Sequence, residues 1–103
     1  MVAAVENNLN KIIDACKRHQ VKSLYVFGSA ATGKFNKQSD IDFLVEYHKD
    51  KEGLPVPSFD YFDFLFFLEE LTGNKVDLVV TEAVRNKFFK AQIDKEKVLV
   101  YAE

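Results

Sequence analysis

Three short apolar segments rich in β-branched and aromatic residues constrain the fold of this chain more than any other feature. They cover residues 24–27, 41–47 and 76–80, and each has the length and composition of a buried β-strand. Successive residues of the second segment alternate between an apolar face and a face that carries acidic groups. A further apolar stretch at 98–101 predicts a short last strand.

Helical signals fill much of the sequence between these strands. Apolar residues at helical spacing, with charged residues on the other sides, predict an amphipathic helix over residues 6–19. Ser58 is a good N-cap and Gly73 is a stop signal, so we expect a second helix between them. Thr81 predicts the cap of a third helix that runs to about Phe89.

The order of these elements predicts the α+β class, with helices and a mixed sheet in a single small domain of residues 1–103. The 14 basic against 16 acidic side chains argue against general nucleic-acid binding, which needs a basic surface. No apolar run reaches the ~18 residues of a membrane span, and residues 1–10 lack the pattern of a signal peptide. The only cysteine, Cys16, is expected in the core and fits a reducing cytoplasm.

Three acidic residues stand where apolar residues would be expected. Asp40 and Asp42 are two positions apart on one predicted strand, so both carboxylates should leave the same face, and Asp77 lies inside the third strand. Carboxylates that converge on one sheet face repel one another, and a divalent cation is the natural counter-charge. Because all the donors are oxygens, Mg²⁺ is the cation expected there.

The dipeptide Gly28-Ser29 sharpens this interpretation, because a D-x-D pair alone is common on solvated strands. It follows directly on the first strand and opens a polar loop over residues 29–38, with room for one helical turn. Glycine allows a tight turn and a close backbone approach, and the amides that follow can face a phosphate.

The spacing Gly28-Ser29-x10-Asp40-Ile41-Asp42 resembles the signature of the polymerase-beta-like nucleotidyltransferase superfamily. The string GSAATGKFNKQSDIDFLV is especially similar to the minimal nucleotidyltransferase (MNT) family, and Asp77 matches the third carboxylate of that family. The resemblance implies the nucleotidyltransferase fold, in which a mixed sheet flanked by helices places the second and third strands side by side.

The resemblance also implies roles for these residues. Asp40 and Asp42 would bind two Mg²⁺ ions, and Asp77 would complete the metal site and help to deprotonate an acceptor hydroxyl. Gly28 and Ser29 would hold the β- and γ-phosphates of ATP or another nucleoside triphosphate. The implied reaction is an in-line displacement at the α-phosphorus, for which paired metal ions are a general solution.

One position departs from the family pattern. Many MNT proteins have an arginine in the stretch after Gly-Ser, where this chain has Thr32. Lys34 or Lys37 could supply the positive charge, although a lysine offers a point charge and not a bidentate fork. This substitution favours a weakly active or inactive MNT-fold binding module over an enzyme, whereas the three carboxylates favour the enzyme.

The acceptor is expected to be presented by another protein, because a chain of 103 residues leaves no room for the acceptor domain of larger members. The resemblance implies a HEPN-domain toxin as partner and an antitoxin role, by transfer of AMP to a tyrosine of the partner, by binding it, or both. Transfer to a small molecule or an RNA end is a third hypothesis, against which the low positive charge counts.

The second predicted helix also indicates a partner or a homo-oligomer, since its apolar residues surround almost the whole circumference. Phe67 falls between two aspartates on the side expected to be wet, so we expect it to serve an interface. His19 and His48 are expected at the surface, whereas Phe88 and Phe89 are expected to close the core beneath the last helix.

Overall fold

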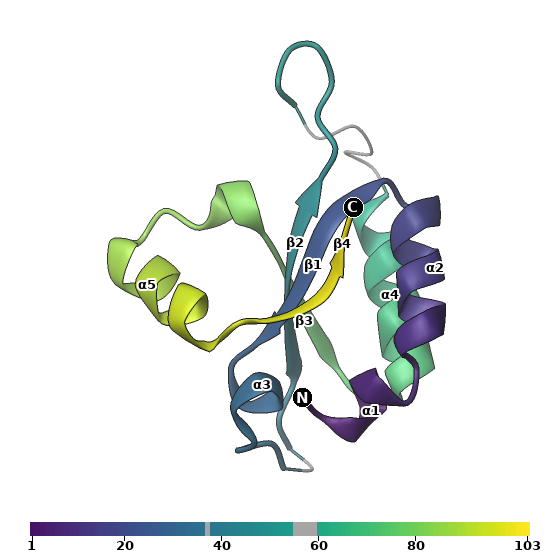
Figure 1. Ribbon diagram of the computed structural model, residues 1–103, viewed down its shortest axis with the longest axis vertical. Helices are drawn as coiled ribbons and strands as arrows, with labels where there is room; N and C mark the ends of the chain where they lie inside the picture. Colours follow the sequence, from purple (N-terminus) through teal and green to yellow (C-terminus); the bar gives the residue numbers. More distant parts are fainter. Residues whose placement is uncertain (37, 55–59) are drawn as a thin grey trace.

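In the computed structural model, four strands form one mixed β-sheet with helices on both of its faces (Figure 1). The structure describes residues 1–36, 38–54 and 60–103. The strand order is β3-β2-β1-β4, in which β2 and β3 run parallel and the other neighbouring pairs run antiparallel. The strands are β1 (Val21–Phe27), β2 (Ile41–Tyr47), β3 (Val76–Val80) and β4 (Val98–Ala102).

The helices confirm the predicted α+β class of a single small domain, although several bounds differ from the predictions. No helix in the described part of the chain is long and apolar enough to cross a bilayer. In chain order the helices are α1 (Ala3–Glu6), α2 (Leu9–Arg18), α3 (Ser29–Thr32), α4 (Tyr61–Thr72), the 3-10 turn η1 (Thr81–Ala83) and α5 (Lys87–Glu96).

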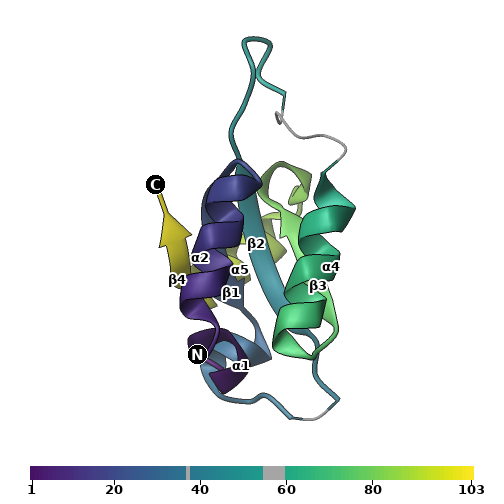
Figure 2. The ribbon, with the colours of Figure 1, turned by 90° about the vertical axis from the view of Figure 1, so that its right-hand side faces the viewer.

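The main core lies between the sheet and the helices α2 and α4, which run side by side on one face (Figure 2). The alternate residues Ile41, Phe43 and Val45 of β2 are fully buried on this face, as the sequence pattern predicted. Cys16 on α2 is also fully buried, and burial raises the pKa of its thiol to about 12. A thiol in this setting acts as a small apolar group.

A second, smaller core lies on the opposite face of the sheet, beneath α5. It consists of Phe27 at the end of β1, Leu44 of β2 and Ile93 of α5. Ile93 is the only residue that α5 buries, so the helix covers this face loosely. This arrangement leaves much of the face accessible next to the helix.

The prediction that a helix begins at Thr81 is wrong. Thr81 starts only the short turn η1, because its hydroxyl donates a hydrogen bond to the carbonyl of Val45 at 3.1 Å and does not cap a helix. The cap is Asn86, whose side chain accepts hydrogen bonds from the amides of Phe88 and Phe89 at 2.9 and 3.0 Å. Asparagine is the stronger N-cap, and it moves the helix toward the C-terminus.

The later start of α5 also explains why Phe88 and Phe89 do not close the core. The register set by Asn86 turns Ile93 toward the sheet and leaves Phe88 87% and Phe89 44% exposed. Phe89 keeps an edge-on contact with Phe27, with 6.1 Å between ring centroids.

The single helix predicted over residues 6–19 is interrupted at Asn7 and Asn8, which separate α1 from α2. The side-chain amide of Asn8 donates to the carbonyl of Ala4 at 2.7 Å. Such local side-chain bonds compete with the helical hydrogen-bond pattern and explain the break.

The aromatic helix α4 ends as predicted, with Gly73 in the left-handed conformation at its C-terminus, while its predicted N-cap Ser58 lies outside the described residues. Phe67 is not on the wet side. It is half-buried against the main core, with the guanidinium carbon of Arg18 at 5.4 Å from its ring centroid. The exposed aromatic residues are instead Phe62 and Phe66, at 61% and 58%.

His19 contacts two aromatic or acidic side chains at and near the start of α4. Nδ1 of His19 lies 2.5 Å from Oδ2 of Asp60, and its ring lies 5.2 Å from that of Phe64. His19 is therefore half-buried between α2 and α4, contrary to the prediction of a solvated residue. His48 lies at the surface as expected, 2.7 Å from Oε2 of Glu103.

Candidate active site

Asp42 and Asp77 are partners in the parallel ladder between β2 and β3. Directly paired residues of adjacent strands point to the same face of a sheet, so both carboxylates leave the face that α5 partly covers. Phe27 is the partner of Asp42 on the other side, in β1. Phe27, Asp42 and Asp77 thus form one row across three strands.

The acidic groups near this row act on one another. The pKa of Asp42 is raised from 3.8 to about 6, first by burial and then by the charges of Asp77, Asp40 and Glu96. Asp40 directly precedes β2 and is exposed, so it flanks the pair and does not stand within the strand. The four acidic groups together create a strongly negative local field that favours a cation.

Glu96 was missed by sequence reasoning. It is the last residue of α5, whereas the predicted helix ended at about Phe89. The carboxylate of Glu96 comes near β2 only because α5 extends to residue 96. Asn86, as a strong N-cap, was the sequence signal that could have predicted these bounds of α5.

Gly28 lies against the carboxylate of Asp42. A Cβ atom added at Gly28 would stand 2.5 Å from Oδ2 of Asp42, and the residue has φ +67. The backbone is in a region that L-residues rarely adopt, which favours glycine, and an added Cβ would force the carboxylate of Asp42 to move. The turn that ends β1 is therefore built directly onto Asp42.

Ser29 begins the short helix α3, which the sequence predicted as one helical turn. The carbonyl of Gly28 accepts hydrogen bonds from the amides of Ala31 and Thr32 at 3.0 and 3.1 Å. The amides at the start of such a turn have no partners within it, so they can meet phosphate oxygens. Gly28 thus lies against Asp42, and Ser29 follows it at the start of α3, so this turn is a candidate for phosphate binding.

The positive charges of this loop lie farther along the chain. Thr32 ends α3 and is exposed, as is Lys34. Lys37, the other lysine expected to meet the triphosphate, lies outside the described residues.

The chemistry of the acidic groups fits Mg²⁺. In residues 1–36, 38–54 and 60–103 no three His, Cys, Asp or Glu side chains are close enough together to hold a metal ion by themselves. Mg²⁺ does not need such a cage, because it is usually bound through one or two carboxylates, with waters and substrate phosphates as the other ligands. The pair Asp42 and Asp77, next to the turn at Gly28, offers this kind of partial shell.

Comparison with known proteins agrees with this geometry. The nucleotidyltransferase domain family matches residues 9–100. The chain belongs to the nucleotidyltransferase family. Within this family, a candidate protein adenylyltransferase from Methanocaldococcus jannaschii is 34% identical over 84 residues, which cover 81% of this chain and 80% of the relative.

Solved structures of nucleotidyltransferases share the fold. A candidate minimal nucleotidyltransferase superposes with a TM-score of 0.75 and 27% identity, over 95% of each chain. The MNT antitoxin in complex with a tri-AMPylated HEPN toxin from Shewanella oneidensis superposes with a TM-score of 0.65 and 19% identity, over 95% of this chain and 72% of that one. The predicted minimal nucleotidyltransferase fold is thereby confirmed.

Proposed function

We propose that this nucleotidyltransferase transfers AMP from ATP to a hydroxyl group of a HEPN-domain partner and so acts as an antitoxin. The observation that carries the proposal is the row of Asp42 and Asp77 across β2 and β3, with Gly28 packed on Asp42. Its relatives include candidate protein adenylyltransferases, and a structural neighbour is an MNT antitoxin with a tri-AMPylated HEPN toxin.

In this proposal the chain's own residues position the triphosphate and move one proton. The turn at Gly28 and Ser29 holds the β- and γ-phosphates, while Asp42 and Asp77, flanked by Asp40, would hold Mg²⁺ together with waters and phosphate oxygens. When bound, Mg²⁺ supplies charge neutralisation at the phosphates. Asp77 accepts the proton of the acceptor hydroxyl as its oxygen forms a bond to the α-phosphorus. The bond between the α- and β-phosphates breaks, and pyrophosphate leaves.

A binding module without chemistry is the second candidate function. Thr32 in place of the arginine of many MNT proteins favours it, as do Phe62 and Phe66, whose rings lie 6.0 Å apart and are exposed on α4. Clustered exposed aromatic residues are typical of protein interfaces. In this alternative the fold neutralises or scaffolds its partner by association alone.

Two forms of labelled ATP test the enzyme directly. The purified chain, its HEPN partner and Mg²⁺ are incubated with ATP that carries the label at either the α- or the γ-phosphate. The proposal predicts that the partner gains label from the α-position only, since the γ-phosphate leaves with pyrophosphate. If the partner gains no label from either position, the proposal of AMP transfer is contradicted.

The second candidate function, neutralisation by binding alone, is tested in cells. If chemistry is required, Asp42→Ala should fail to neutralise the toxin although it still associates with it. Full neutralisation by Asp42→Ala would instead establish that the chain works by binding.

A further inference from the structure

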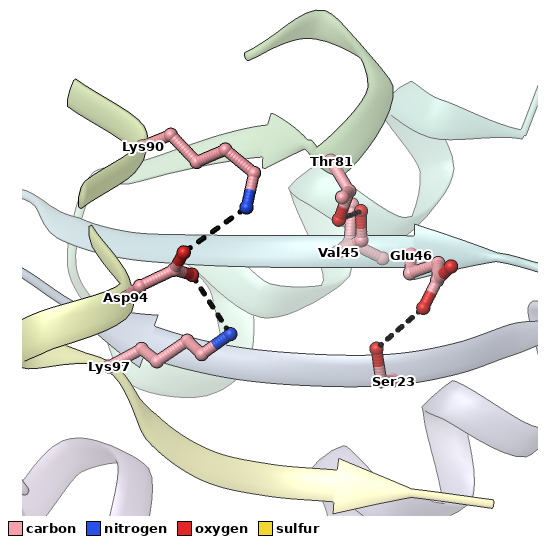
Figure 3. Close-up of polar contacts among 7 residues, drawn as sticks. All are labelled: Ser23, Val45, Glu46, Thr81, Lys90, Asp94 and Lys97. Carbon is pink, nitrogen blue, oxygen red and sulfur yellow. Dashed lines mark hydrogen bonds and ion pairs between the residues drawn. The ribbon is translucent and has the colours of Figure 1, made fainter. Parts of the chain in front are cut away.

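A shallow cavity of about 80 Å³ lies between α5, η1 and the sheet, on the same face as Asp42 and Asp77. Its floor is apolar and its rim is charged. Figure 3 shows the charged rim from α5 together with Thr81 and β2. The lining residues are Leu44, Thr81, Val84, Lys90, Ile93, Asp94 and Lys97.

The ladder register places this cavity next to the carboxylates. Leu44, which lines its floor, is partnered by Tyr25 in β1 and by Val79 in β3. This row is the next one along the same face from the row of Asp42 and Asp77. Rows that share a face are about 7 Å apart along a strand, which is about the length of the ribose that joins a base to its α-phosphate.

The rim of the cavity carries a network of ion pairs that is partly exposed to solvent. The carboxylate of Asp94 lies 3.1 Å from Nζ of both Lys90 and Lys97. Lys97 is further held by the ring of Tyr25, whose centroid lies 4.5 Å from its Nζ. Hydrogen bonds from Lys97 and from Lys90 lower the pKa of Asp94, so this carboxylate stays ionised and acts only as an acceptor.

This pattern of groups suits the edge of an adenine ring. Adenine presents an amino donor beside a ring-nitrogen acceptor on its major-groove edge. Asp94 can accept from the amino group while it keeps both lysines, because a carboxylate has about four lone-pair sites. Lys90 or Lys97 can donate to the ring nitrogen, and the faces of Leu44 and Ile93 can contact the ring.

We propose that this cavity binds the base of the nucleoside triphosphate and that Asp94, flanked by Lys90 and Lys97, accepts a hydrogen bond from an amino group of the base. The inference rests on the proposed function, because it assigns the base of the same substrate whose phosphates lie at Gly28 and Ser29. The proposal assigns base recognition to α5, whereas the phosphates are assigned to the separate turn at Gly28 and Ser29.

The test compares ATP with inorganic tripolyphosphate, which has the phosphates but no base. Affinities of both for the full chain are measured by calorimetry with Mg²⁺, for the parent and for Asp94→Ala and Lys97→Met. The matched control is Lys95→Met, an exposed lysine on the same helix that does not line the cavity. Thermal melts confirm that each variant is folded.

Both cavity variants should bind ATP about tenfold or more weakly, which is the usual effect of losing a hydrogen bond to a charged group. Their affinity for tripolyphosphate should be unchanged, and Lys95→Met should match the parent for both ligands.

Unchanged ATP affinity in both variants would overturn the assignment, as would an equal loss for ATP and tripolyphosphate. These outcomes are separable from the proposed function. If the parent transfers AMP but both variants keep the parental ATP affinity, only the assignment of the cavity as the base site is refuted. If the parent binds ATP and the variants show the predicted losses, but no partner is labelled, only the proposal of AMP transfer is refuted.

Discussion

The carboxylates of Asp42 and Asp77 leave the same face of the sheet from partnered positions in β2 and β3. This relationship follows from the parallel register, because a shift by a single residue would send one of the two side chains to the opposite face. Gly28, at the end of β1, lies against the carboxylate of Asp42. Three segments far apart in the sequence thus depend on one another at this point.

Gly28→Ala should abolish most of the transfer activity. The new Cβ would stand 2.5 Å from Oδ2 of Asp42, and displacing a reacting group by an ångström can cost about a hundredfold in rate. Gly73→Ala is the matched control, because Gly73 has φ +68 and nothing within 4 Å of an added Cβ. Gly73→Ala should lose about 1–2 kcal/mol of stability from left-handed backbone strain. Gly28→Ala should lose about 1–3 kcal/mol, because Gly28 has φ 67 and ψ -149, a conformation that almost only glycine adopts. Urea unfolding measures both losses, and only Gly28→Ala should lose activity.

Asp42→Asn should be more stable than the parent in the absence of metal at high pH. Since folding raises the pKa of Asp42 from 3.8 to about 6, the folded state binds more protons than the unfolded chain between these values. The free energy of unfolding of the parent therefore falls as pH rises through this window. Asp42→Asn should remove this fall, and the two proteins should converge below the lower value.

Denaturant unfolding at a series of pH values, with chelator present, measures this effect. Asp63→Asn, an exposed site on α4, is the control and should follow the parent. Added Mg²⁺ should stabilise the parent above the folded pKa of Asp42 but stabilise Asp42→Asn much less. A parent that gains stability with rising pH through this window would contradict the account of Asp42.

Exposed and half-buried aromatic residues on α4 should behave differently when replaced. Phe66→Ser should weaken association with a partner by about one to two orders of magnitude and leave stability nearly unchanged, because its ring is 58% exposed. Phe67→Ser should cost about 1–3 kcal/mol of stability, since Phe67 packs against the main core. Sedimentation or calorimetric titration measures the association, and thermal melts measure the stability. Equal association constants for Phe66→Ser and the parent would remove α4 from the interface.

Most of the secondary structure, and the acidic residues as candidates for a site, could be predicted from the sequence because their signals are local and strong. The strands 41–47 and 76–80 have the predicted bounds, since alternation and β-branched composition specify a strand almost alone. Gly28 and Ser29 follow β1 as predicted. The mutual position of Asp42 and Asp77, however, came from the family resemblance, because strand order depends on contacts between distant segments.

The errors arose where two local signals competed or where tertiary contacts decided. Thr81 and Asn86 are both good N-caps, and only the bond from Thr81 to Val45 removes the first from consideration. The exposure of Phe67 was misjudged because Asp60 looks like a surface residue until His19 lies against it. Glu96 and the cavity beneath α5 could not be found without the true bounds of that helix.

The central claim is that Asp42 and Asp77 form the carboxylate pair that drives nucleotidyl transfer. The most direct test is the initial rate of α-label transfer from ATP to the partner protein, for the parent, Asp42→Asn and Asp77→Asn. Glu46→Gln is the control, because Glu46 lies on the same strand β2 and contacts only Ser23 among the polar side chains drawn in Figure 3. Both aspartate variants should lose about two to three orders of magnitude, and Glu46→Gln should keep the parental rate. Transfer by Asp42→Asn or Asp77→Asn at the parental rate would contradict the claim.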